Sequence, residues 1–188
     1  MTFRQFNRTA AASYAIKYAL HYNPEWPSDK RQDRAGGGGD CTNFVSQALL
    51  AGGWTMVNGF KRDPRTWYSG KAGCDVYDDR SWTWASAENF SSFLTLGRRA
   101  RRCQMGELAL GDVVQLRDYN LVHHTMIVTA ILPDVLKRPV AFVTYHTTDV
   151  SQKPLTAILA KEIMCWKILD LFDDDVRIFS PSPRITSR

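Results

Sequence analysis

The chain has 188 residues, of which 44% are hydrophobic and 12% aromatic, and this suits one globular domain with a sizeable core. Only 23% of the residues are charged, which excludes wholesale disorder. The net charge is +5, and part of this basic excess is local, in "GRRARR" (Gly97 to Arg102), which we interpret as a basic, solvated loop. Because no aromatic-rich basic stripe or zinc-finger spacing accompanies it, we expect no nucleic-acid partner.

The first segment, Gln5 to His21, has apolar and aromatic residues at helical spacing and predicts an amphipathic helix that the prolines of "YNPEWP" end. No stretch reaches the ~20 apolar residues of a membrane-spanning helix, so we expect no membrane insertion. The N-terminus also lacks a charged start followed by an apolar run, and we therefore expect no secretory signal. A protein acting in the periplasm or at the cell wall would then need a non-standard delivery route; otherwise it would be cytoplasmic.

The next segment, "AGGGGDCTNFVSQALLAGGW" (Ala35 to Trp54), predicts a helix that begins at Asp40 or Cys41 after a run of glycines. Asp40 is a favourable N-cap and places the Cys41 sulfur in the first turn, where unpaired N–H groups and the helix dipole favour the thiolate. Such a cysteine can attack a carbonyl carbon, and N–H groups of the same turn can hold the oxyanion. Asp40 and Asn43 either cap the helix or contribute substrate or oxyanion-hole contacts.

A third helix is predicted over Ser81 to Leu96, with Ser81 as its cap. The second half is β-rich: "GDVVQLRDY", "HTMIVTAIL" and "PVAFVTYHT" predict an antiparallel meander, and "AKEIMCWKIL" is a strand or a short helix. Helices followed by strands predict an α+β domain, with N-terminal helices packed on a C-terminal antiparallel sheet. Residues 180–188 are expected to form a flexible tail.

The four cysteines, Cys41, Cys74, Cys103 and Cys165, include no C-x-x-C pair. They therefore predict neither a disulfide framework nor a structural zinc site, although a single Cys74–Cys103 bridge stays open. A catalytic metal held by Cys41 and two histidines would lack a fourth ligand or a general-base glutamate, so we expect no metal and no cofactor.

Three histidines lie on the predicted strands as candidate bases. His123 and His124 open one strand and must point to opposite faces, so at most one can face Cys41. His146 ends the next strand, where it would lie beside a histidine that starts the antiparallel neighbour. One ring would then be the general base and the other a residue that orients it, with Asp149 as a rival for the orienting role. A helix-start cysteine with histidines on adjacent strands is the papain-like layout.

The stretches "FNRTAAASYAIKYALHYNPEW", "GGDCTNFVSQALLAGGWTM", "SWTWASAENFSSFL", "LGDVVQL", "HHTMIVT" and "TYHTTDVSQKPL" occur in this order over residues 3–155. In sequence and spacing they resemble the bacterial putative amidase domain family, a branch of the NlpC-like, papain-fold cysteine peptidases and amidases. The resemblance implies a single papain-like domain over residues 1–188, with a nucleophilic Cys41, a base at His124 and a third polar residue at His146.

The resemblance also implies that the protein hydrolyses an amide bond in peptidoglycan stem peptides or similar short peptides. Acyl transfer would use the same residues, and a non-catalytic wall- or protein-binding module is the alternative of another class. A wall-cleaving protein without a signal peptide would be a phage lysin, a toxin delivered into a rival cell, or a domain cut from a longer secreted protein. A delivered toxin implies an immunity protein that blocks its site.

Overall fold

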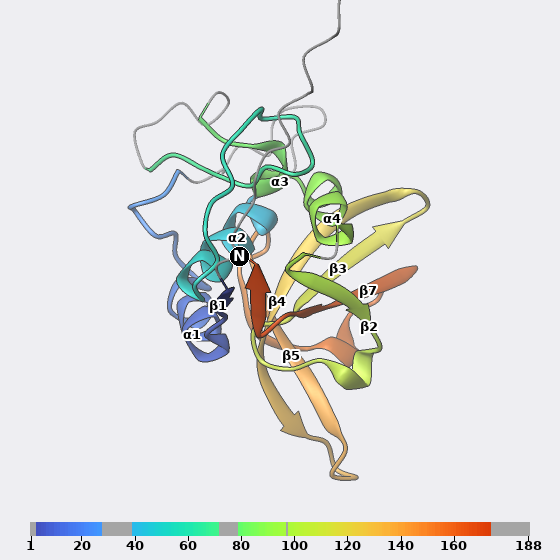
Figure 1. The fold of residues 1–188 in the computed structure, drawn as a ribbon. Helices are drawn as coiled ribbons and strands as arrows, with labels where there is room; N and C mark the ends of the chain where they lie inside the picture. The colour runs from blue at the N-terminus through green and yellow to red at the C-terminus, as the bar shows by residue number, and fades with distance from the viewer. Residues whose placement is uncertain (1–2, 28–38, 72–78, 97, 174–188) are drawn as a thin grey trace, which may run out of the picture.

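The computed structural model describes residues 3–27, 39–71, 79–96 and 98–173. Helices lie along one side of a β-sheet, and a long hairpin extends from the sheet at the far end (Figure 1). In chain order the elements are β1 (Phe3–Gln5), α1 (Arg8–Tyr18), α2 (Cys41–Ala51), α3 (Trp82–Ala85), α4 (Ala87–Thr95), β2 (Ala100–Cys103), the 3-10 turn η1 (Met105–Glu107), β3 (Val113–Asp118), β4 (Leu121–Pro133), β5 (Pro139–Tyr145), β6 (Val150–Pro154), the 3-10 turn η2 (Leu155–Ala157), β7 (Glu162–Ile168) and β8 (Leu171–Asp173).

The main sheet has six strands in the order β2-β7-β3-β4-β5-β6, and every neighbouring pair in it is antiparallel. β1 and β8 form a separate antiparallel pair. The structure thus confirms an α+β fold in which helices precede a mainly antiparallel sheet. β4 is a central strand, and α1, α2 and α4 all pack against it.

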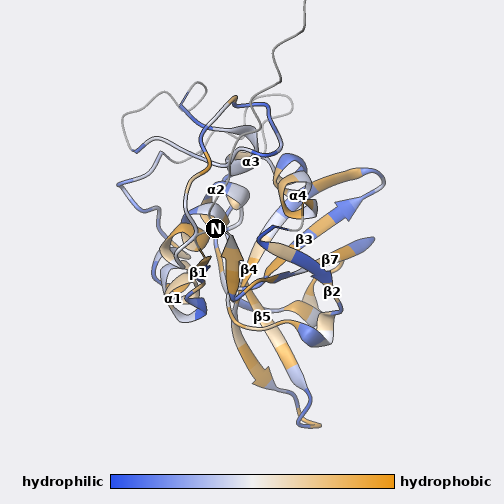
Figure 2. Ribbon diagram, in the orientation of Figure 1, coloured by the Kyte–Doolittle hydropathy of each residue, from blue (hydrophilic) through white to orange (hydrophobic). Residues whose placement is uncertain are grey.

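Two hydrophobic clusters lie on opposite faces of the sheet. The helix-side cluster contains buried aromatic residues such as Phe44 and Trp84 together with Ile127 of β4. The second cluster contains Met126 and Val128, the neighbours of Ile127, because successive side chains of a strand point to opposite faces. Both faces of β4 are therefore apolar, which agrees with its hydrophobic colouring in Figure 2.

Three predicted boundaries need correction. The first helix begins at Arg8 rather than at residue 5, because Asn7 accepts a hydrogen bond from the Ala10 N–H (2.9 Å) and caps it. The predicted third helix is two helices, since Ser86 is extended (φ −103°, ψ 129°) and caps α4. The predicted basic loop contributes to β2, where Arg101 and Arg102 are exposed on an edge strand.

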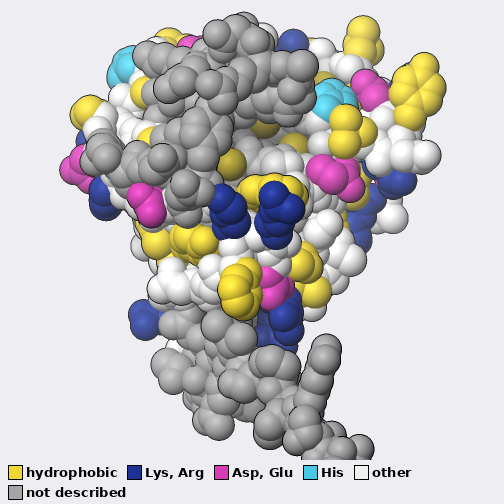
Figure 3. All heavy atoms as spheres, turned by 90° about the horizontal axis from the view of Figure 1, so that it is seen from above, with side chains coloured by type: hydrophobic (Ala, Val, Ile, Leu, Met, Phe, Trp, Pro, Cys, Tyr) yellow, Lys and Arg dark blue, Asp and Glu magenta, His cyan; other side chains and the backbone are white. Residues whose placement is uncertain are grey.

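Other expectations meet the structure only in part. Cys103 is a free thiol, so a bridge to Cys74 receives no support, and Cys74 itself lies outside the described residues, as does the predicted tail at 180–188. Among the described helices, none is long and apolar enough to cross a membrane. Viewed from above, Lys and Arg side chains are scattered among acidic and hydrophobic ones (Figure 3).

Candidate active site

Cys41 is the first residue of α2 and is only 3% exposed. Asp40 occupies the N-cap position, but its side chain forms no capping hydrogen bond. The first three N–H groups of a helix have no partner within the helix. Because the Asp40 side chain does not cap these N–H groups, they stay available beside the Cys41 sulfur, although the charge of Asp40 helps to raise the pKa of the thiol.

Three threonines surround the sulfur of Cys41. The Thr42 hydroxyl lies 3.8 Å from it, the Thr125 N–H faces it, and the Thr147 side chain is close enough to lower the pKa of the thiol. Burial raises the pKa of the Cys41 thiol, while these three donors act in the opposite direction. The residue is therefore a thiol at neutral pH, in a setting where hydrogen-bond donors await the thiolate.

The sulfur lies where two central strands separate. The β4–β5 ladder runs only as far as the pair Ile127 and Thr144, so the main chain of Thr125 lies beyond it. Since the Thr125 N–H contacts the sulfur, Cys41 abuts the peptide bond that joins His124 to Thr125. The helix N-terminus and the start of β4 thus meet at the Cys41 sulfur.

A buried chain of hydrogen bonds fixes Thr42 and Thr125. Their hydroxyl oxygens are 2.9 Å apart, and the Gln115 side-chain amide donates to the Thr125 hydroxyl (3.2 Å). The Trp166 indole N–H in turn donates to the Gln115 oxygen (3.0 Å). This chain ties the start of α2 to β3, β4 and β7.

A second buried network begins at Asp40. One carboxylate oxygen lies 2.9 Å from Nδ1 of His146, and the other accepts from the Asn43 amide (2.7 Å). The Asn43 amide also donates to the Pro27 carbonyl (2.9 Å), and its oxygen accepts from the Trp84 indole (2.7 Å). Both amide hydrogens and the oxygen of Asn43 are therefore used inside the protein. The side chains of Asp40 and Asn43 are buried next to Cys41 and are not open to solvent.

The His146 ring is held on all sides. Its Nε2 lies 2.7 Å from the Tyr18 carbonyl, and Phe44 stacks on the ring with centroids 3.9 Å apart. Because both nitrogens face oxygen acceptors, both contacts are satisfied only when each nitrogen carries a proton. With Nδ1 protonated in this way, the contact with the Asp40 carboxylate is a buried ion pair.

Gly39 explains why a glycine precedes the Asp40–Cys41 pair. A Cβ at this position would lie 2.2 Å from the Thr147 hydroxyl oxygen, and the Thr147 side chain helps to lower the pKa of the Cys41 thiol. Thr147 itself has φ 93°, an unfavourable conformation for a β-branched residue. Gly39 thus lets a strained threonine reach the cysteine, and strain of this kind often accompanies functional sites.

His124 is on the other face of the sheet. Its ring meets the Tyr145 ring edge-on at 4.8 Å, in the cluster opposite the helices. Burial lowers the pKa of His124 to about 4, and repulsion from His123 contributes less. The ring is therefore a neutral base at neutral pH. Within the described residues, no hydrogen bond joins it to the Cys41 sulfur.

The structure also shows where His123 and Asp149 lie. His123 is the extra residue in a register shift of the β3–β4 pair, and its Nε2 lies 3.2 Å from Asp118. Asp149 lies on the same side of the sheet as His146. Burial raises the pKa of Tyr22 to about 12, and the negative charges of Asp40 and Asp149 contribute, so both carboxylates lie near Tyr22. Tyr22 contacts the His146 ring at 4.5 Å.

The structure therefore brings together Cys41, Asp40, Asn43 and His146, and it places the His124 backbone beside the sulfur. It does not bring the His124 and His146 rings side by side as their positions on adjacent strands predicted. Ile127 pairs with Thr144, so this register continued places His146 opposite Thr125, and the two rings face opposite sides of the sheet. Among the described residues no group of three metal-ligating side chains converges.

Sequence reasoning missed the threonines. Thr42, Thr125 and Thr147 each directly follow a predicted site residue, namely Cys41, His124 and His146. Their hydroxyl and backbone groups surround the sulfur, but a threonine carries no reactive group that a motif search would select. Adjacency to the selected residues was the one available signal.

The comparison with models of known protein families gives a match. A family model described as a putative amidase domain matches residues 5–168, which include every site residue described above. No curated protein and no solved structure matches the chain.

Proposed function

The chain belongs to the putative amidase domain family, and from this premise we propose that it cleaves an amide bond with Cys41 as nucleophile and His124 as general base, in a papain-like, NlpC-like arrangement. One observation carries the proposal: the Cys41 sulfur lies at the start of α2 against the His124–Thr125 peptide, among donors that favour a thiolate. His124, whose imidazole is neutral at neutral pH, is the residue on the N-terminal side of that peptide bond.

The reaction begins with a neutral thiol and a neutral imidazole. When substrate binds, the His124 ring turns from the Tyr145 side of the sheet toward the sulfur and takes the proton of Cys41 as the sulfur attacks the amide carbonyl carbon, while N–H groups of the first turn of α2 hold the oxyanion. The imidazolium then protonates the leaving amine, and the acyl group stays on sulfur. Water, deprotonated by His124, releases the acid and restores the thiol. In sites without substrate the base–nucleophile hydrogen bond is often long, and it tightens when substrate binds.

The Asp40–His146 pair acts in this scheme through the nucleophile. His146 anchors Asp40, and Asp40 anchors Asn43, so the pair holds the residues on both sides of Cys41. His146 is thereby a positioning residue for the sulfur. Asp40 and Asn43 contribute through their backbones at the oxyanion, because their side chains are used within the network.

The proposed substrates are peptidoglycan stem peptides. The likeness to cell-wall amidases supports this class, and the net charge of +5 suits approach to an anionic wall. We further propose that the protein works as an antibacterial lysin or delivered toxin at the wall, with an immunity protein that blocks the Cys41 site in the producing cell.

The test is digestion of purified peptidoglycan, with released fragments identified by mass spectrometry. We expect fragments from the wild type and from Cys103→Ser, a matched cysteine variant outside the site, and none from Cys41→Ala or His124→Gln. Fragments that carry an added amine in place of water would assign acyl transfer. Equal release by Cys41→Ala would overturn the nucleophile, and silence from all four proteins would overturn the substrate.

The pH dependence of kcat/KM tests the base. Because His124 must be unprotonated and its pKa is about 4, activity should rise through pH 4 and stay level near neutrality. The measurement is kcat/KM between pH 3 and pH 8, with a peptide substrate that contains the bond identified in the digestion. An acid limb centred near the ordinary histidine value of ~6.5 would contradict a buried His124 as base.

A further inference from the structure

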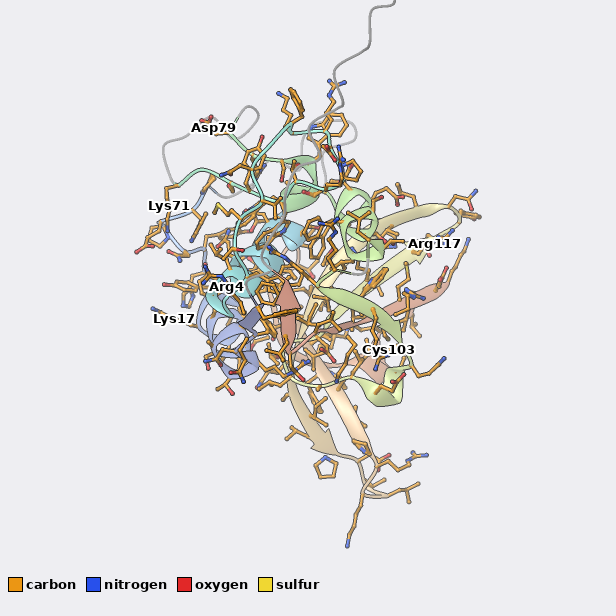
Figure 4. The ribbon with its side chains drawn as sticks, in the orientation of Figure 1. Arg4, Lys17, Lys71, Asp79, Cys103 and Arg117 are labelled. Carbon is orange, nitrogen blue, oxygen red and sulfur yellow. The ribbon has the colours of Figure 1, made fainter. Side chains whose placement is uncertain are left out.

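Two free cysteines face each other across the edge of the sheet. Cys103 ends β2 and pairs directly with Cys165 of β7 in the antiparallel register. Figure 4 labels Cys103 at this end of β2. Directly opposite residues of an antiparallel pair point to the same face, with Cβ atoms about 4.5–5.5 Å apart. A disulfide needs Cβ atoms roughly 3.5–4.5 Å apart and Cα atoms 4.4–6.8 Å apart, so a small approach suffices.

The edge position of β2 makes that approach feasible. β2 pairs with β7 alone in the six-stranded sheet, so it can shift without breaking a second ladder. Cys165 is a buried member of the cluster on the face away from the helices, and Cys103 packs against the same cluster. Both sulfurs therefore lie over one apolar surface.

The chemistry of this surface favours a disulfide over two thiolates. Burial raises the pKa of both thiols, and burial together with the nearness of Cys103 raises that of Cys165 to about 11. The charges that act on the pair are of both signs: Asp112 and Glu107 against Lys167, Arg101 and Arg102. A disulfide carries neither charge nor proton, so it fits an apolar setting without desolvation cost.

We propose that Cys103 and Cys165 form a redox-sensitive cross-strand disulfide that staples the edge strand β2 to β7 when the protein meets a disulfide oxidant. The thiolate of the partly exposed Cys103 attacks one sulfur of a small disulfide, such as oxidised glutathione, and releases one glutathione thiolate. The Cys165 thiolate then attacks the Cys103 sulfur and releases the second glutathione. Two protein thiols are oxidised, one disulfide is reduced, and the two thiol protons pass to the released glutathione.

This inference does not depend on the proposed amidase reaction, because neither cysteine belongs to the Cys41 site. It does bear on where the protein is stable, since such bonds persist in oxidising compartments. The bond would close a loop that contains β3 to β6, and long loops gain most from closure in the chain-entropy account.

The experiment oxidises the purified full chain with oxidised glutathione at mildly alkaline pH, blocks remaining thiols with N-ethylmaleimide and maps tryptic peptides without reduction. We expect the peptide 103–117 joined to the peptide 162–167, and a chain lighter by the mass of two hydrogens. A link from Cys103 to Cys74 or Cys41, or free thiols at both positions, overturns the proposal.

Thermal unfolding supplies the control. Oxidation should raise Tm of the wild type and of Cys74→Ser by roughly 5–10 °C, and leave Tm of Cys103→Ser unchanged. Cys103 is the better position to substitute because Cys165 is only 3% exposed and its loss risks the core. An equal rise of Tm in Cys103→Ser would also overturn the assignment.

Discussion

The two histidines on opposite faces of the sheet, His146 and His124, have contrasting environments. On the helix side, His146 has an oxygen at each ring nitrogen and an aromatic ring stacked on it. On the other side, His124 meets the edge of Tyr145, and burial without a charged partner lowers its pKa to about 4. Both rings are largely buried, yet one has an acceptor oxygen at each nitrogen and the other has no charged partner.

This difference separates a structural role for a histidine ring from a role in proton transfer. A ring whose two protons are both committed to Asp40 and Tyr18 cannot accept another, and giving one up would leave an acceptor oxygen unsatisfied. A neutral ring with an available nitrogen can take a proton and return it. The same residue type therefore serves as an anchor on one face and as a candidate base on the other, and experiments can separate the roles.

The largest expected effect is on stability when the anchor is removed. His146→Leu takes the ring donor from the buried Asp40 carboxylate and should lower the free energy of unfolding by about 3–5 kcal/mol. His124→Leu at pH 7 should change it by less than about 1 kcal/mol, because it removes a neutral ring without a charged partner. Urea unfolding of both variants measures the contrast.

A second substitution tests whether the unpaired Asp40 carboxylate causes the loss of stability in His146→Leu. In the His146→Leu background, Asp40→Asn removes the buried charge and should restore part of the lost stability. If Asp40→Asn instead adds its full separate cost, the two residues are not coupled and the ion pair is not the anchor. Equal losses for His146→Leu and His124→Leu would contradict the comparison itself.

The fold could be predicted in outline from its sequence because its signals are local. The glycines Gly52 and Gly53 mark the end of α2, and the β-branched runs of the second half mark β3, β4 and β5. The break at Ser86 was missed because the flanking segments share one apolar pattern, and only the backbone of Ser86 separates them. β2 was missed because its arginines suggest a loop, while its pairing with β7 is a long-range contact.

The local setting of Cys41 was predictable, but the geometry of the candidate site was not. The sequence placed the cysteine correctly at the first residue of a helix, while the catalytic roles of Cys41, His124 and His146 stay predictions. It could not foresee that the two histidines are out of register by one residue, which sends their rings to opposite faces. Nor could it foresee that Asp40, a favourable N-cap, would instead pair with His146.

A smaller effect should appear in the pH dependence of stability. The pKa of His124 in the folded protein, about 4, lies below its ordinary value of 6.5, so the unfolded chain binds the proton first. The stabilisation is complete above pH 6.5 and is lost as the pH falls towards 4, by at most about 3 kcal/mol. Urea unfolding of wild type and His124→Leu across this window should show the difference. A constant difference between the two proteins would show that His124 does not titrate abnormally.

The smallest predicted effect concerns the glycine that precedes Asp40 and Cys41. Gly39→Ala would place a methyl group 2.2 Å from the Thr147 hydroxyl, so it must displace a residue that lowers the pKa of Cys41. We expect a loss of about 2 kcal/mol in unfolding free energy, a cost typical of overpacking, and slower alkylation of Cys41 by iodoacetamide at neutral pH.

Thr147 provides the matched control for this position. Thr147→Gly should relieve its own strained backbone (φ 93°) and make room for the new methyl group, so the double variant should recover the stability lost by Gly39→Ala. It should not recover the alkylation rate, because the hydroxyl that favours the thiolate is gone. Recovery of both would mean that Thr147 only fills space, and the helix side would then contribute anchoring but no activation to Cys41.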